Sequence, residues 1–102
     1  MKLSKHYSDK STKVLGLGNL FDMNEVRSSG DPDFYKNLKE EVKEECQKYG
    51  TVRDMKIDKK KMIVYVRFED LLSSQTVNEK LQDRVFSSKP IVTGYYSKSI
   101  FD

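Results

Sequence analysis

The residues best suited to chemistry in this chain of 102 residues are charged side chains on one expected helix and in one short loop. The helix is expected from Asp31 to Tyr49, with Pro32 in its first turn and Gly50 as its stop signal. Advancing about 100° per residue places its lysines on one flank and most of its glutamates on the other. These glutamates are Glu40, Glu41 and Glu44. A solvated helix face is the ordinary role of such a run.

Glu45 differs from these glutamates because it projects inside the apolar stripe of the same helix. The stripe consists of Phe34, Tyr35, Leu38, Val42, Cys46 and Tyr49. A carboxylate buried there alone would cost several kcal/mol, so Glu45 either has a cationic partner or curls back to water. The sequence by itself leaves these two interpretations equal.

The loop that precedes the last expected strand holds an arginine and a phenylalanine two residues apart, in the segment Arg84-Val85-Phe86. Phe86 could anchor a ligand, or it could plug the core beneath the loop. Arg84 could pair with a carboxylate, or it could lie solvated on the surface. The loop is therefore a candidate binding element.

The sequence offers no set of residues for catalysis. It contains no nucleophile–base pair, no metal-ligating cluster and no complete glycine-rich phosphate loop, because Phe21 stands where such a loop needs its third glycine. Cys46 is the only cysteine, which excludes an internal disulfide and a cysteine-based zinc site. We therefore expect no enzyme activity, no metal and no cofactor. No stretch approaches the length of a membrane span, so we expect no membrane partner.

The elements that must position these residues follow the order β-α-β-β-α-β. Strands are expected at 13–20, 51–57, 62–68 and 90–96, with the second helix at 71–81 and a polar loop at 21–30. This order predicts a ferredoxin-like α+β sandwich, in which two helices cover one face of a four-stranded antiparallel sheet. The domain would span residues 13–97, between a flexible lead-in at 1–12 and a C-terminal tail at 98–102.

RNA-recognition motifs share this order, and the expected third strand resembles one of their two sheet signatures. The family's stacking aromatics would stand at Gly16, Ile63 and Tyr65, but only Tyr65 is aromatic. Each stacked base contributes ~1–3 kcal/mol, so the loss of two platforms predicts weak or absent RNA binding. A residual RNA face would comprise Ile63, Tyr65 and Arg67. We expect Tyr65 to pack on its neighbours instead.

Three features together resemble the U2 auxiliary factor homology motifs of pre-mRNA splicing factors. They are Arg84-Val85-Phe86, the acidic helix from Glu40 to Gly50 and the eroded stacking aromatics. The resemblance covers Lys13 to Tyr96 and is nearest to the domains of coactivator-type Arg/Ser-rich splicing factors and of the U2 auxiliary factor large subunit. It implies a non-catalytic nuclear domain that binds a short basic peptide containing a tryptophan. The implied partners are the splicing factor 3b large subunit or the branch-point-binding protein.

The resemblance also implies roles for individual residues. The implied peptide-binding set is Glu40, Glu41, Glu44, Glu45, Arg84, Val85 and Phe86. A ligand tryptophan would insert between the two helices and stack on Phe86, beneath an ion pair of Arg84 with Glu45. Glu41, supported by its acidic neighbours, would receive the ligand's lysine or arginine.

Three positions depart from the family's pattern. Asn37 is acidic in some relatives, and Asp83 and Ser88 replace glycines that are common there. Two other functions stay open. The first is a domain that binds single-stranded RNA directly, with Tyr65 and the basic residues at 59–61, although a formal net charge of +3 does not by itself predict this. The second is a ferredoxin-like enzyme of the acylphosphatase kind, for which the sequence supplies no catalytic residues.

Overall fold

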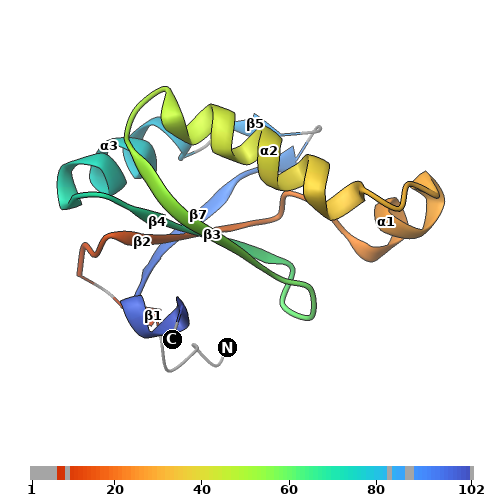
Figure 1. Ribbon diagram of the computed structural model, residues 1–102, viewed down its shortest axis with the longest axis horizontal. Helices are drawn as coiled ribbons and strands as arrows, with labels where there is room; N and C mark the ends of the chain where they lie inside the picture. The colour runs from red at the N-terminus through yellow and green to blue at the C-terminus, as the bar shows by residue number, and fades with distance from the viewer. Residues whose placement is uncertain (1–6, 9, 83, 87–88, 102) are drawn as a thin grey trace.

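The computed structural model describes residues 7–8, 10–82, 84–86 and 89–101. Along the chain the elements are β1 (Tyr7–Ser8), β2 (Val14–Gly18), α1 (Met23–Ser29), α2 (Phe34–Gln47), β3 (Val52–Asp58), β4 (Ile63–Phe68), α3 (Leu71–Leu81), β5 (Val85–Phe86), β6 (Lys89–Pro90), β7 (Val92–Tyr96) and the 3-10 helix η1 (Lys98–Phe101). The main sheet has the order β1-β7-β2-β4-β3 with antiparallel neighbours, and α2 and α3 lie on one side of it (Figure 1). The ferredoxin-like α+β fold is confirmed.

The core fills the space between the sheet and the two long helices. Alternation along β4 puts Val64, Val66 and Phe68 in this core, as the sequence predicts. The apolar stripe of α2 is confirmed as well, because its buried residues are Leu38, Val42 and Cys46. Within the described part of the chain, no helix has both the length and the apolar character needed to cross a membrane.

The helix α1 stands where the sequence was expected to form a polar loop, so that expectation was wrong. Asp22 caps the helix by accepting a hydrogen bond from the Glu25 amide at 2.8 Å, and Gly30 ends it in the left-handed conformation with φ of 59°. The spacing Asp-x-x-Glu followed by a glycine is the sequence signal that predicts such a helix. α1 supplies an acidic side chain to the site described below.

The first and last described elements, β1 and η1, lie on the side of the sheet that the long helices leave open (Figure 1). β1 adds a strand beside β7, with Tyr7 opposite Tyr96 and Ser8 opposite Tyr95. Part of the expected flexible lead-in is therefore ordered as a strand, and part of the expected tail forms η1. Residues 1–6, 9 and 102 of these segments lie outside the described residues.

The first long helix begins and ends slightly inside the limits expected from the sequence. Asp31 lies ahead of α2 and accepts hydrogen bonds from the Asp33 amide at 2.8 Å and from Asn37 Nδ2 at 3.1 Å. It therefore orders the approach to the helix instead of capping it. At the other end, a Cβ on Gly50 would lie 2.6 Å from Ser73 Cβ, so Gly50 is needed for close packing on α3.

Candidate functional site

The segment Arg84-Val85-Phe86 lies in a short hairpin in which β5 pairs with β6, Phe86 being opposite Lys89. The backbone of Arg84 is held on both sides, since its amide donates to Leu81 O and its carbonyl accepts from the Ile91 amide. Strand alternation then turns Val85 outward, where it is 67% exposed, and Phe86 inward onto the core. Asp83 and Ser88, the two departures from the family's pattern, lie outside the described residues.

Arg84 reaches from this hairpin to the C-terminal half of α2. Its Nη1 donates to Glu45 Oε1 at 3.1 Å, and its Nη2 donates to Tyr49 Oη at 3.1 Å. The other oxygen of Glu45 accepts from Lys48 Nζ at 2.8 Å, and this hydrogen bond raises the pKa of Lys48. Glu45 therefore has two cationic partners, and one of them is the arginine that the resemblance implies.

An acidic hollow of about 260 Å³ opens beside Phe86, among α1, the first turns of α2 and the hairpin. It is lined by Leu20, Phe21, Glu25, Asp31, Phe34, Asn37, Leu38, Glu41 and Phe86. Five of its nine lining residues are aromatic or aliphatic, and its charged groups are all carboxylates. Such a lining suits a ligand that combines an apolar group with a cationic one.

The space beneath Glu45 is almost filled. About 10 Å³ remains there, among Leu17, Leu20, Val42, Glu45, Leu81, Phe86 and Ile91. Phe86 lines both this space and the acidic hollow. A ligand ring therefore has to displace the Phe86 side chain or the hairpin before it can lie between α2 and α3.

Lys89 reaches from the hairpin to two carboxylates, and one of them, that of Glu25, lines the acidic hollow. Its ammonium group donates to Asp22 Oδ2 at 2.7 Å and to the carboxylate of Glu25. Donating hydrogen bonds to these two carboxylates raises the pKa of Lys89, and accepting the one from Lys89 lowers the pKa of Asp22. A polar loop at 21–30 does not predict this cluster, because the helix α1 is what places Glu25 beside Asp22.

The structure separates the glutamates that the resemblance groups together. Glu41 lines the acidic hollow, and Glu45 pairs with Arg84. Glu40 instead lines a groove on the opposite flank of α2, and Glu44 is exposed to solvent without lining either hollow beside Phe86. Glu41, Glu45, Arg84 and Phe86 therefore form one site, and Glu40 and Glu44 do not line it.

The residual RNA face expected on the sheet is largely covered. Tyr65 is only 1% exposed and meets the Tyr96 ring edge-to-face, with ring centroids 5.0 Å apart. The Tyr96 ring lies so close over Gly16 that a Cβ on Gly16 would overlap it. Burial raises the pKa of Tyr65 to about 12. Tyr65 thus packs on its neighbours, and Tyr96 fills the place of the missing first-strand aromatic.

The helix η1 covers the neighbouring part of the same face. The Arg67 guanidinium pairs with Asp54 and lies 5.3 Å from the centroid of the Phe101 ring. Lys56 Nζ donates to Ile100 O at 3.1 Å, which holds η1 against β3. Ile63 remains partly exposed at the start of β4. Bases could reach the ring of Tyr65 only if Tyr96 moved.

Among the described residues, no three side chains of the metal-ligating types form a group that could hold a metal ion. Cys46 is a free, buried thiol, and burial raises its pKa to about 12. It lies in the core beneath α2, as a small apolar residue would.

Comparison with solved structures identifies the class of fold. The Nab3 RRM, solved in work on cis element recognition of non-polyadenylated RNAs, matches with a TM-score of 0.58 and 16% identity over 84% of this chain and 95% of that one. The RNA15 RRM matches with a TM-score of 0.58 and 20% identity over 89% of this chain and 97% of that one. The chain therefore has the fold of an RNA-recognition motif.

Comparison with curated sequences finds a similarity that covers part of a larger protein. The mouse serine/threonine-protein kinase Kist is 32% identical over 93 residues, which are 88% of this chain and 22% of the kinase. The human kinase of the same name is 31% identical over the same length. The chain thus spans about a fifth of the curated relatives it matches, and no protein-family model matches it.

Proposed function

We propose that this domain binds a short linear peptide containing a tryptophan and basic residues, as a non-catalytic domain of a nuclear pre-mRNA splicing factor. The observation that supports this most directly is the ion pair of Arg84 with Glu45, which joins the hairpin to α2 beside Phe86. Partners of this chemistry include the splicing factor 3b large subunit and the branch-point-binding protein.

Binding would begin at the acidic hollow, because its carboxylates attract a cationic segment before any close contact forms. Glu41 would receive a ligand lysine or arginine at the exposed edge. The tryptophan would then displace Phe86 outward and stack on it, in the space that is now nearly closed. Arg84 would stay paired with Glu45 and cover the ring, so the ion pair would lose water only in the complex.

Direct recognition of single-stranded RNA is the competing function, and the Nab3 RRM of the same fold supports it by likeness. In this chain the sheet face would have to expose Tyr65, which now packs under Tyr96. The cost of uncovering it disfavours stacking, so RNA affinity should be weak and should fall steeply with salt.

Calorimetric titration with two probes would test the proposal. The first probe is a peptide of three arginines and lysines followed by one tryptophan, with a tryptophan-to-alanine peptide as its matched control. The second probe is an oligopyrimidine RNA at the same salt concentration. We expect the tryptophan peptide to bind at least roughly 30-fold more tightly than its control, as for a buried aromatic anchor. Equal binding of both peptides, or tighter sequence-selective binding of the RNA, would contradict the proposal.

A further inference from the structure

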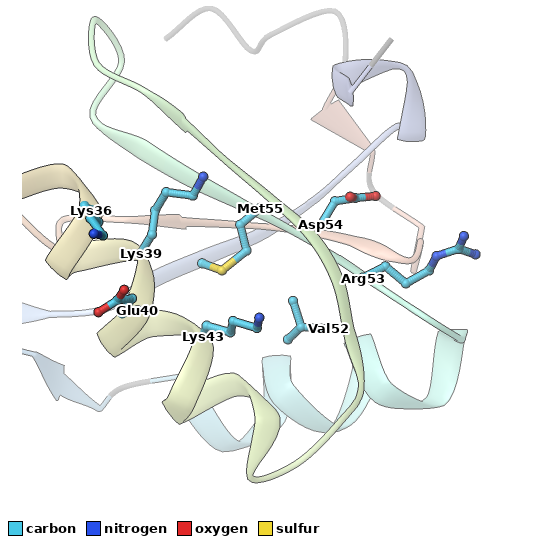
Figure 2. A pocket seen from close by; sticks show the side chains of 8 residues that line it. All are labelled: Lys36, Lys39, Glu40, Lys43, Val52, Arg53, Asp54 and Met55. Carbon is cyan, nitrogen blue, oxygen red and sulfur yellow. The ribbon is translucent and has the colours of Figure 1, made fainter.

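A basic groove of about 370 Å³ lies between α2 and β3, on the flank of α2 opposite the acidic hollow (Figure 2). It is lined by Lys36, Lys39, Glu40, Lys43, Val52, Arg53, Asp54 and Met55. Val52 and Met55 extend into the space between the strand and the helix, and Lys39 and Lys43 reach along it from α2 (Figure 2). β3 is the last strand of the sheet on this side, so the groove runs along an open edge.

Three lysines give the groove a positive charge that the fold does not neutralise. Lys36, Lys39 and Lys43 recur at spacings of three and four residues, which places them on one face of α2. None of the three forms an ion pair with another described residue. All three are exposed to solvent, so their ammonium groups can pair with an incoming anion.

The acidic residues of the groove weaken this charge only in part. The Asp54 carboxylate is already paired with Arg67 on the sheet. Glu40 is the one carboxylate of the lining with no ion pair among the described residues. Arg53 adds a fourth cation at the outer edge, where its Nε lies 3.6 Å from Glu69 Oε2. Cations therefore outnumber carboxylates along the groove.

The bottom of the groove is apolar. Val52 and Met55 are partly buried and pack against the core, which leaves part of each side chain facing the groove. A methionine side chain is flexible and adapts to an irregular apolar partner. An apolar strip beside a row of lysines matches a ligand that carries both carboxylates and an apolar side chain.

We propose that the basic groove binds a short acidic peptide segment with an apolar residue among its carboxylates. A nucleic acid fits less well, because bases need aromatic faces for stacking and no lining residue is aromatic. Continuous strand addition along β3 also fits less well, because the register with β4 shifts between Val52 and Asp54. Side-chain contacts therefore carry the binding.

The basic groove and the acidic hollow take ligands of opposite charge on opposite flanks of one helix. They use different residues of α2, since Lys39 and Lys43 line the first and Glu41 lines the second. The domain can therefore hold an acidic segment and a basic segment at the same time. Binding at the basic groove does not depend on the function proposed for the other site.

The test uses the 102-residue chain and a fluorescein-labelled acidic heptapeptide, Glu-Asp-Glu-Leu-Asp-Glu-Asp, with a copy carrying glycine in place of leucine. Fluorescence anisotropy should show the leucine peptide binding at least about threefold more tightly than the glycine copy. The double variant Lys39→Glu with Lys43→Glu should weaken binding roughly tenfold or more, since two favourable charge pairs become repulsive.

The matched control is Lys60→Glu with Lys61→Glu, which makes the same change of charge on the exposed turn after β3. It should change the affinity by less than about threefold, because salt screens charges outside the groove. Melting curves should show that both variants fold. Backbone amide shifts on adding the peptide should change at Val52 and Met55 and stay unchanged at Phe86.

Three results would overturn the inference. The first is equal weakening by the two charge-reversal pairs, which would show a response to net charge alone. The second is equal binding of the leucine and glycine peptides. The third is an oligouridylate that binds more tightly than the acidic peptide and shifts the same amides. Failure of the tryptophan peptide to bind would leave all three readouts unchanged, so the two proposals fail separately.

Discussion

Arg84 Nη1 lies 3.1 Å from Glu45 Oε1, although the two residues are 39 positions apart in the sequence. The contact joins the hairpin to α2, close to Phe86 in the same hairpin. The side chain of Glu45 is 29% exposed and that of Arg84 is 49% exposed, so water still screens the pair. Lys48 pairs with the same carboxylate, so in the free protein Glu45 divides its electrostatic attraction between Lys48 and Arg84.

The coupling between Glu45 and Arg84 should therefore differ between folding and binding. We expect a double-mutant cycle of Glu45→Ala with Arg84→Ala to give roughly 0.2–1 kcal/mol in the free energy of unfolding. The same cycle in affinity for the tryptophan peptide should give roughly 2 kcal/mol or more, because the ligand ring removes water from the pair. Urea denaturation and calorimetry measure the two quantities. Additive effects on affinity would show that the pair does not act as a unit in binding.

Phe86→Ala should abolish detectable binding of the tryptophan peptide while the domain remains folded. Phe86 is partly buried, and truncating an aromatic anchor of this kind typically costs ~2–4 kcal/mol of binding energy. Leu72→Ala, at an exposed position of α3, is the matched control and should leave both affinity and melting temperature nearly unchanged. If Phe86→Ala instead unfolds the domain completely, Phe86 is mainly a core plug.

Glu41→Lys should slow association with the basic peptide, and this effect should shrink as salt rises. Glu41 is exposed at the edge of the acidic hollow, so its contribution should be roughly 0.2–1 kcal/mol at low salt. Glu44→Lys makes the same charge change one turn on, at a position that does not line the hollow, and should have the smaller effect. Stopped-flow association at several salt concentrations measures the difference. A larger effect at Glu44 would place the ligand on the solvent side of α2.

The domain should lose stability at alkaline pH because of Tyr65. Burial raises the pKa of Tyr65 to about 12, against about 10 in an unfolded chain. Between these values the folded state retains a proton that the unfolded state has lost, so the free energy of unfolding falls as pH rises. Cys46, whose pKa burial also raises to about 12, adds to the loss above about pH 9.

The variant Tyr65→Phe measures how much the Tyr65 hydroxyl contributes to this loss of stability at alkaline pH. At neutral pH it should be nearly neutral, because the Tyr65 hydroxyl is buried without a hydrogen-bond partner among the described residues. In urea denaturation at about pH 8 and about pH 11, the variant should lose less stability than the wild type. Tyr95→Phe, at a partly exposed position, should keep the wild-type dependence. An unchanged alkaline loss in Tyr65→Phe would assign the effect to other groups.

Gly50→Ala should destabilise the domain by ~1–3 kcal/mol, since the added methyl group would overlap the backbone and side chain of Ser73 on α3. Gly18→Ala is the matched control, because its Cβ would meet Val92 at ordinary contact distances. That change should be neutral or stabilise by ~0.4–1 kcal/mol. Thermal melting of both variants measures the difference, and an equal effect at the two glycines would contradict the packing argument.

Local periodicity determined the fold class and most of the elements. The alternation of Val64, Val66 and Phe68 specified a strand with one buried face, and the stripe of Leu38, Val42 and Cys46 specified a helix on that face. These patterns can be read locally because each depends on residues within a few positions of one another. The short helix α1 has no buried residue, so its capping pattern is the only feature of the sequence that indicates a helix there.

The sequence also marked Glu45 as a carboxylate in need of a partner, and Arg84 as a charge beside an aromatic. It could not decide between pairing and solvation for either residue. That choice depends on where the hairpin lies relative to α2, which the packing of Phe86 and the backbone bonds of Arg84 determine.

Tertiary structure alone decided which surfaces are available. Tyr96 covers Gly16 and Tyr65, and Lys89 enters the acidic cluster of α1, through contacts between segments far apart in the chain. Glu40 and Glu41 are neighbours in sequence, yet they line different hollows, because successive residues of a helix diverge by about 100°. Side-chain type and spacing are local properties of the sequence. Which residue a charged side chain pairs with, and whether an aromatic ring is covered, depend on how the whole chain packs.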